Sequence, residues 1–138
     1  MLDKKAAMEL FAVAEEARER SYSPYSGISV GAALLAKSGK VYIGTNIENA
    51  SYTPTVCAER TAFFSAIADG EREFVAIAIS GGKHGKVGDD GFYPCGVCRQ
   101  VMAEFCTPEF EIITKTKEQC ESHTLSEMLP AAFTPDKL

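Results

Sequence analysis

Apolar residues recur at helical spacing over the first twenty positions of the chain. Charged Glu and Arg side chains separate them, and the apolar set is Ala6, Ala7, Leu10, Phe11, Ala14 and Ala17. Such spacing places the apolar residues on one face of a helix. The pattern therefore predicts an amphipathic helix over residues 2–20 that packs on another element. Pro24 and Gly27 then interrupt regular structure.

Two short alternating runs follow this break. In residues 28–34 and again in residues 41–45, apolar side chains occupy every second position. A period of two is typical of a strand that is buried on one face. The segment KSGK, residues 37–40, lies between the runs and has the composition of a compact turn. The two runs are therefore predicted to form a β-hairpin.

Helices and buried strands alternate along the rest of the chain. A second helix is expected over Cys57–Asp69, with Gly70 at its C-terminal end. Residues 74–80, FVAIAIS, are short and apolar like a strand buried on both faces. After a glycine-rich loop over residues 81–93, the remaining predicted elements are a helix from Pro94 to Glu104, a strand over 110–114 and a short helix over 125–129.

This order of elements indicates an α/β fold. We expect a three-layer α/β/α sandwich around a central sheet of about five strands, and the initial hairpin makes that sheet mixed. A length of 138 residues suits one ordinary domain. Residues 1–138 are thus expected to form a single catalytic domain.

Charge and composition narrow the possible partners. The net charge of -5 disfavours binding to nucleic acid and docking on an anionic membrane surface. No apolar run approaches the roughly 20 residues that span a bilayer, and the N-terminus does not resemble a secretory signal. We expect a cytoplasmic protein. In that reducing compartment, five cysteines favour metal binding or thiol chemistry over disulfides.

Three of the cysteines lie at predicted helix starts. Cys57 belongs to the segment TVCAER, and Cys95 and Cys98 belong to YPCGVCRQ. Exposed amide groups and the helix dipole favour thiolates at such positions. Three thiolates around Zn²⁺ leave the fourth tetrahedral position open, which is typical of catalytic zinc. We therefore expect one zinc ion per chain, held by Cys57, Cys95 and Cys98.

Charged residues flank these predicted ligands. Glu59 follows Cys57 by two positions, close to the metal but turned away from direct ligation, so it is expected to act as the catalytic proton shuttle. Three thiolates give the zinc centre a formal negative charge. Arg60 and Arg99 each neighbour a ligand and are expected to offset this charge through hydrogen bonds to sulfur.

A Cys-x-x-Cys pair also fits other roles. Redox pairs of this kind usually follow the first strand of their domain, whereas Cys95 and Cys98 come late in the chain. A structural zinc site needs a fourth Cys or His. Cys106 and Cys120 are available, but Cys106 lies two turns farther along the predicted helix and points away from its start. The combination of Cys-Ala-Glu with a later Pro-Cys-x-x-Cys is more specific than either part.

These motifs resemble those of the small free-nucleoside cytidine deaminases, in the cytidine and deoxycytidylate deaminase family. The segments YSPYSGISVGAALL, GTNIENASY, CAERTA, PCGVCRQVM and EMLP follow one another as in that family, from about Ser21 to Phe133. The zinc motif matches the three-cysteine variant of the deaminase signature. The resemblance implies hydrolytic deamination of cytidine and deoxycytidine in pyrimidine salvage, in which Glu59 protonates ring N3 and then the departing amine.

The resemblance also implies which residues bind the nucleoside. Asn46 and Glu48 would bind the ribose hydroxyls, and the backbone of Ala58 would contact the pyrimidine. Tyr52, together with Phe133 from a neighbouring subunit, would wall the pocket. Small members of the family are homotetramers with shared active sites, so a homotetramer is expected here. The preference between ribose and deoxyribose stays open.

One predicted pocket residue departs from the family. Members commonly place a Phe against the base where this chain has Ile28, an aliphatic residue that cannot stack as a ring does. Phe92 and Tyr93 directly precede Pro94, and core packing is favoured for both over a place in the pocket wall. His84 and His123 lie outside every motif and are expected on the surface.

Three other functions compete with this interpretation. A deaminase for another aminopyrimidine nucleoside, such as blasticidin S, would share the metal motifs, although the intact NIENA segment favours cytidine. A deaminase that edits polynucleotides fits the acidic charge poorly. A non-catalytic binding module stabilised by zinc would have no use for Glu59.

Overall fold

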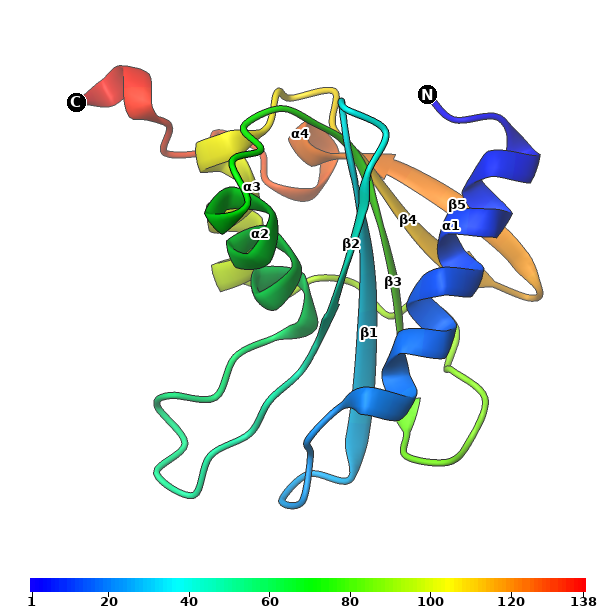
Figure 1. Cartoon of the computed structure of the whole chain (residues 1–138). Helices are drawn as coiled ribbons and strands as arrows, with labels where there is room; N and C mark the ends of the chain where they lie inside the picture. The colour runs from blue at the N-terminus through cyan, green and yellow to red at the C-terminus, as the bar shows by residue number, and fades with distance from the viewer.

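A five-stranded mixed sheet runs through the middle of the molecule. The computed structural model describes residues 1–138, and Figure 1 shows its ribbon. The strands are β1 (Ile28–Ala36), β2 (Val41–Thr45), β3 (Phe74–Lys83), β4 (Glu111–Thr116) and β5 (Gln119–Thr124). Their order in the sheet is β2-β1-β3-β4-β5. Only β3 and β4 pair in parallel, and the other neighbours are antiparallel.

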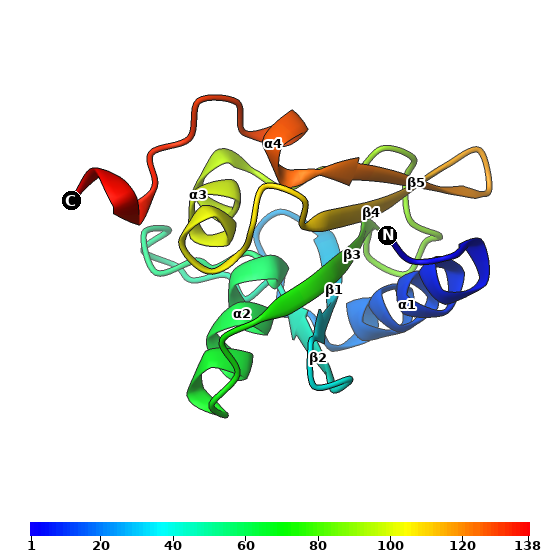
Figure 2. The ribbon, with the colours of Figure 1, turned by 90° about the horizontal axis from the view of Figure 1, so that it is seen from above.

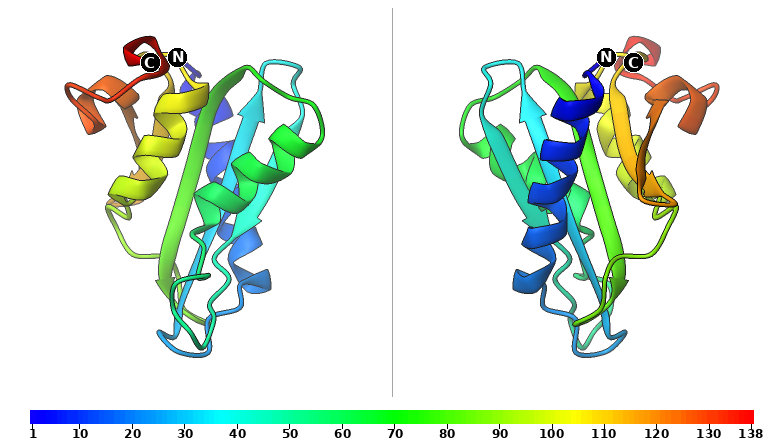
Figure 3. Two further views of the ribbon diagram at one scale, coloured as in Figure 1. Left: turned by 90° about the vertical axis from the view of Figure 1, so that its left-hand side faces the viewer. Right: turned by 90° about the vertical axis from the view of Figure 1, so that its right-hand side faces the viewer.

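Helices cover both faces of this sheet. Helix α1 (Lys4–Ala17) packs on one face, whereas α2 (Ala58–Ala68) and α3 (Gly96–Phe105) lie together on the other, as Figures 1 and 2 show. The two side views in Figure 3 show α2 and α3 in front of the sheet on one side and α1 crossing it on the other. The predicted three-layer α/β/α sandwich with a mixed sheet is confirmed. A short helix α4 (Leu125–Met128) follows β5 directly.

The alternating strands bury one set of side chains beneath each helical layer. Val30, Ala32 and Leu34 of β1 belong to a sixteen-residue apolar cluster under α2 and α3, which includes the fully buried Phe63. Ala33 belongs to a second cluster of seven residues under α1. Successive side chains of a strand point to opposite faces of the sheet. Because helices cover both faces, the side chains of β1 are small or apolar on each of them.

Two strand glycines let the helices approach the sheet closely. A Cβ atom at Gly31 would collide with the backbone of α1 at Ala14, and one at Gly44 would collide with the backbone of α2 at Ala58. Neither glycine has a positive φ, so space rather than backbone conformation excludes a side chain. These contacts fix the height of each helix above the sheet.

The sequence pattern missed one strand. β5 reads QCESHT and has no apolar alternation, because it lies at the edge of the sheet and pairs only with β4. The turn before it places Lys117 and Glu118 at positive φ. Hairpin turns of that shape usually contain Asn or Gly, and the absence of both here explains why no turn was predicted.

Other boundaries moved by a few residues. β3 continues through Gly81 and Gly82 to Lys83, beyond the predicted end at Ser80. Helix α3 begins at Gly96, with Cys95 rather than Pro94 at its N-cap. His84 is exposed as predicted, but His123 is half-buried between Glu121 and Glu127. None of the helices combines the length and apolar character that crossing a bilayer requires.

Candidate metal centre and adjoining pocket

Two helix N-termini on the same face of the sheet bring three thiols together. Cys57 is the N-cap residue of α2, and Cys95 is the N-cap residue of α3. Cys98 lies in the first turn of α3, where its backbone amide donates to the Cys95 sulfur at 3.5 Å. The first amides of a helix have no partner within the helix, and they favour negative charge at these positions. Both predicted helix starts therefore carry their cysteines as expected.

The spacing of the sulfurs fits a tetrahedral zinc ion. Cys57 Sγ lies 3.8 Å from Cys95 Sγ, and Cys95 Sγ lies 3.5 Å from Cys98 Sγ. Zn–S bonds of about 2.3 Å in a tetrahedral site separate neighbouring sulfurs by about 3.8 Å. All three ligand atoms lie within 4.8 Å of one another. No fourth Cys, His or carboxylate joins this group, so the donor set matches an open zinc site rather than a closed structural one.

The remaining cysteines are remote from this centre. Cys106 caps the opposite end of α3, and burial raises the pKa of its thiol. Cys120 lies on β5, and burial raises its pKa as well. Inert, protonated thiols are typical of cysteines that only fill space. All five cysteines are free, so there is no disulfide framework.

Charge around the three thiols favours thiolate at Cys57. A hydrogen bond from the Cys98 thiol lowers the pKa of Cys57 to about 5, with further help from Arg60 and against the effect of burial. The same thiol contact, together with burial, raises the pKa of Cys98. The Arg60 guanidinium lies close enough to act directly, because its Nη2 is 3.5 Å from Cys57 Sγ. A cation at this point offsets the negative charge that thiolates accumulate.

Arg99 does not share this role. Its Nε donates to the carbonyl of Pro94 at 2.8 Å, and its Nη1 donates to the carbonyl of Met128 at 2.6 Å. The expectation that Arg99 bonds to sulfur is therefore wrong. The side chain instead ties the segment before Cys95 to α4, because a guanidinium can serve two separated carbonyls at once.

Glu59 lies in the first turn of α2 and is almost completely buried, with 4% of its surface exposed. Burial raises the pKa of this carboxyl to about 7, and the nearby Cys57 adds to the shift. A carboxyl with a pKa near neutrality can both accept and return a proton under physiological conditions. Ordinary helix-start glutamates remain exposed and acidic, so this burial distinguishes Glu59 from a solvated residue.

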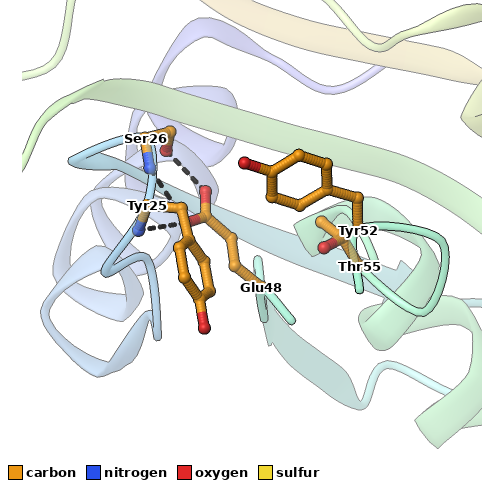
Figure 4. Close-up of a pocket in the computed structure, with 5 residues that line it drawn as sticks. All are labelled: Tyr25, Ser26, Glu48, Tyr52 and Thr55. Carbon is orange, nitrogen blue, oxygen red and sulfur yellow. Dashed lines mark hydrogen bonds between the residues drawn. The ribbon is translucent and has the colours of Figure 1, made fainter. Parts of the chain in front are cut away.

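A pocket of about 370 Å³ lies near the N-terminal end of α2, lined by Tyr25, Ser26, Glu48, Tyr52 and Thr55. Its size falls in the range of small-ligand pockets. Figure 4 shows the Glu48 carboxylate beside the turn that carries Tyr25 and Ser26, with both tyrosine rings near it. The rings lie edge to face, with centroids 6.2 Å apart. The thiols are not part of this lining, although Thr55 is only two residues from Cys57.

Glu48 holds the turn before β1. Its carboxylate accepts from the backbone amides of Tyr25 and Ser26 at 2.9 and 3.1 Å, and also from the Ser26 hydroxyl. The Ser26 bonds, mainly, lower the pKa of this carboxyl. A carboxylate that is ionised at neutral pH therefore faces the pocket. Tyr52 has a φ of 63° in the turn beyond it, a conformation that non-glycine residues adopt mainly at constrained sites.

Asn46 is buried at the end of β2 and is bonded at both ends of its amide. Its Oδ1 accepts from Val30 N at 2.9 Å, and its Nδ2 donates to Ile28 O at 2.8 Å. The side chain thus fixes the start of β1, and one Nδ2 hydrogen remains for a ligand. Ile28 itself packs, half-buried, against the larger apolar cluster.

The other two predicted pocket residues lie in different surroundings. Ala58 is fully buried at the first position of α2, directly beside Cys57 and Glu59. Phe133 lies in the C-terminal tail with 59% of its surface exposed, and its carbonyl accepts from Gln100 Nε2 at 2.8 Å. Figure 1 shows this tail leading away from the body of the chain. Phe133 therefore does not line the pocket of its own chain.

Three pocket residues escaped the sequence reasoning. Tyr25, Ser26 and Thr55 line the pocket, but none of them was singled out. Tyr25 could have been predicted, because it is an aromatic residue in the turn SPYSG, where the surrounding turn residues exclude a role in the apolar core. Thr55 gave no such indication, because its hydroxyl simply accepts from the Asn49 amide within the loop.

Comparisons with known proteins agree with this site. A family model described as "Cytidine and deoxycytidylate deaminase zinc-binding region" matches residues 4–114. A protein named "Cytidine deaminase" from Sporosarcina psychrophila is 47% identical over 131 residues, which are 94% of this chain and 93% of the relative. Another of that name, from Halalkalibacterium halodurans, is 48% identical over 124 residues, or 89% and 90% of the two chains. The crystal structure of cytidine deaminase from Burkholderia pseudomallei is similar with a TM-score of 0.81 and 45% identity, covering 96% of this chain and 100% of that one.

Proposed function

The chain belongs to the cytidine and deoxycytidylate deaminase family, and from this premise we infer how its site carries out hydrolytic deamination. The enzyme converts cytidine, and in our proposal deoxycytidine, to the corresponding uracil nucleoside with release of ammonia. Relatives named cytidine deaminase match almost the whole chain. This reaction belongs to pyrimidine salvage.

One zinc ion per chain is the cofactor, and Cys57, Cys95 and Cys98 would hold it. When bound, Zn²⁺ lowers the pKa of water towards 7 and so makes a nucleophile available at neutral pH. Arg60 donates to Cys57 and offsets the charge of the thiolates. The N-termini of α2 and α3 also favour the thiolates, because the helix dipole places partial positive charge there.

Glu59 moves the protons in this proposal. The buried carboxylate takes a proton from the attacking water and delivers it to ring N3. It then takes the remaining proton from the hydroxyl group now on C4 and passes it to the C4 amino group. The C4–N bond breaks, a carbonyl forms at C4 and ammonia leaves. A pKa of about 7 suits both directions of transfer. Burial also keeps bulk water away from the carboxyl, which strengthens its interaction with the substrate.

In this proposal the nucleoside is held by residues from β1, from the segment after β2 and from the start of α2. Asn46 and Glu48 bind the ribose hydroxyls, since an amide and a carboxylate suit a neutral diol. The backbone of Ala58 contacts the pyrimidine, and Ile28 and Tyr52 close the pocket. Arg99 contributes indirectly, because it bonds to the carbonyl of Pro94 just before a metal ligand.

Residues 1–138 act as one catalytic domain in this proposal, and the protein works in the cytoplasm. It assembles as a homotetramer in which Phe133 completes the active site of a neighbouring subunit. Its exposure in the isolated chain supports that role. Nucleic acid and membranes are not partners, which agrees with the net charge of -5.

One observation carries the proposal: a buried glutamate with a pKa near neutrality lies beside three thiols spaced for zinc. A binding module stabilised by zinc would have no reason to bury a carboxylate there, because burial of a charge costs stability. A catalytic site needs this carboxylate to transfer protons.

Metal analysis combined with an ultraviolet absorbance assay tests the function. The purified protein should contain about one zinc per chain and deaminate cytidine and deoxycytidine, with little turnover of blasticidin S. Inertness towards both natural nucleosides with rapid turnover of blasticidin S would replace the assignment with the rival deaminase. Zinc without any turnover would favour the binding module.

A further inference from the structure

Phe92 is an aromatic residue beside the metal centre for which the proposed function has no role. It lies in the loop between β3 and α3, three residues before Cys95. The ring is half-buried and packs against the apolar cluster beneath α2 and α3. Its neighbour Tyr93 turns elsewhere, because the Tyr93 ring meets His123 at 5.6 Å and its hydroxyl reaches Glu121.

The ring of Phe92 lies directly on the backbone of Gly81. A Cβ atom at Gly81 would come within 2.5–2.7 Å of three carbons of that ring. Gly81 has no positive φ, so the glycine is needed here for space. β3 therefore has a gap at Gly81, where the strand carries no side chain, and the ring of Phe92 fills this gap.

The strand register locates this gap next to Ile28. Gly81 pairs with Val30, and Ile28 lies two residues earlier on the same face of β1. Diagonal neighbours across an antiparallel pair are close enough for an aromatic ring to touch. Ile28 and Phe92 both pack against the same apolar cluster. Ile28 provides no aromatic ring, but the ring of Phe92, from the loop between β3 and α3, lies beside it.

The same register locates the gap close to the reacting groups. Gly44 supports Ala58 at the start of α2, and Gly44 pairs with Ala32. Ala32 is two residues from Val30 along the same face of β1, so the Phe92 ring and the helix start that carries Glu59 lie on the same face of the sheet, with β1 between the two glycines that they contact.

We propose that Phe92 forms an aromatic wall of the nucleoside pocket and, paired with Ile28, determines how the pyrimidine base is held. The proposal rests on the proposed function and adds a specificity-determining residue to the same site. An aliphatic residue from β1 and a ring from the loop before α3 together provide the apolar surface for the base.

A single tryptophan provides a test that does not depend on turnover. The chain contains no Trp, so Phe92→Trp places the only indole at the proposed wall, and Phe64→Trp places it on the exposed surface of α2 as a control. Titration with cytidine or uridine should change the emission of Phe92→Trp in a saturable manner and leave Phe64→Trp unchanged. An unresponsive Phe92→Trp protein that still turns over cytidine would overturn the proposal.

Kinetics separate a wall residue from a packing residue. Phe92→Leu should raise KM for cytidine about 2- to 10-fold, the loss expected for one aromatic contact, with kcat little changed. Phe105→Leu, at another half-buried ring in the same cluster, should lower the melting temperature without this change in KM. The double variant Ile28→Phe/Phe92→Val should restore KM towards the wild-type value. A lower melting temperature with unaltered KM for Phe92→Leu would mean that the ring serves only the core.

Failure of the proposed function gives a different result. In that case wild-type protein does not deaminate cytidine. The fluorescence titration of Phe92→Trp then tests by itself whether Phe92 lines a nucleoside pocket. A saturable response to uridine would keep the pocket assignment, and the absence of any response would reject it.

Discussion

Glu59 owes its unusual proton affinity to its position at the start of α2. The residue before it is buried, the sheet lies beneath it and a thiol that favours the anionic form lies beside it. Low-dielectric surroundings and a neighbouring negative charge both disfavour a second anion. The carboxyl is therefore protonated more readily than an exposed glutamate. This state suits a group that must take up a proton and release it within one turnover.

Replacing Glu59 by Gln removes the proton shuttle while preserving the shape of the side chain. We expect Glu59→Gln to keep about one zinc per chain and the native oligomer, and to lose activity by about 10²-fold or more. Metal analysis, light scattering and the absorbance assay measure the three properties. Glu104→Gln, at an exposed site on α3, is the matched control and should behave as wild type. Normal deamination by Glu59→Gln would rule out the proposed role.

At the scale of elements, two glycines decide how closely the helices lie on the sheet. Gly31 faces α1 and Gly44 faces α2, and at either position a Cβ would collide with helix backbone. Backbone cannot rotate away as a flexible side chain can, so the helix has to move. Of α1 and α2, only α2 carries part of the metal site. The two helices therefore provide a comparison between general stability and site geometry.

Alanine at each glycine separates these effects. Gly31→Ala and Gly44→Ala should each lower the free energy of unfolding by about 1–3 kcal/mol or more. Gly44→Ala should also weaken zinc retention against a chelator, because it displaces Cys57 and Glu59, whereas Gly31→Ala should retain zinc. Urea unfolding and chelator titration test both. Equal loss of zinc in the two variants would show that the metal site responds to stability alone.

A polar cluster joins the end of α1 to β3 and the loop after it. The Glu15 carboxylate accepts from the Ser80 hydroxyl and from Gly88 N, and it pairs with Arg18 at 3.0 Å. Arg18 also donates to the carbonyls of Ser29 and Lys83. Burial acts to raise the pKa of Glu15, but its bonds to Ser80, Gly88 and Arg18 outweigh burial and lower the pKa below 4.5.

This lowered pKa predicts how stability depends on pH. The ionised Glu15 stabilises the folded state above about pH 4.5, and the contribution disappears as pH falls through the lower pKa of the folded protein. Glu15→Gln should lower the free energy of unfolding at pH 7 by about 1 kcal/mol. The difference from wild type should shrink below pH 4.5. Urea unfolding at pH 7, 5 and 3.5 measures it, and a difference that stays constant over this range would contradict the prediction.

At the scale of the whole molecule, the isolated chain exposes several aromatic rings. The pocket beside α2 has exposed tyrosines, and Tyr52 shows 73% of its surface. The C-terminal tail, to which Phe133 belongs, leads away from the body of the chain (Figure 1), and 59% of the Phe133 surface is exposed. Exposed aromatic rings on this scale are typical of surfaces that a partner covers. A homotetramer with shared sites would cover both at once.

Mixing two defective variants tests this sharing. Glu59→Gln lacks the shuttle, and Phe133→Ala lacks the ring that is proposed to act in a neighbour. Co-refolded tetramers should regain part of the affinity for cytidine, because intact Glu59 sites then receive Phe133 from Glu59→Gln subunits. Activity that equals the sum of the separate parents would contradict shared sites, and so would a monomeric mass of 14.9 kDa by light scattering.

The sequence by itself determined the elements whose patterns are strong. Helical spacing before Arg20, alternation in β1 and β2 and the apolar run of β3 follow from local periodicity, which depends only on neighbours in the chain. The zinc ligands were also predictable, because Cys57, Cys95 and Cys98 occur at helix starts, where thiolates are favoured. β5 could not be predicted in this way, since an edge strand with polar residues has no pattern of its own.

The tertiary structure decided what each side chain does. Arg60 reaches a sulfur but Arg99 reaches two carbonyls, although both neighbour a ligand in sequence. Glu59 acquires its raised pKa only when the sheet and the thiols surround it. Phe92 meets Gly81 only because β3 and the loop before α3 fold together. Hydrogen bonds, burial and charge are set by residues distant in sequence, and local patterns do not contain that information.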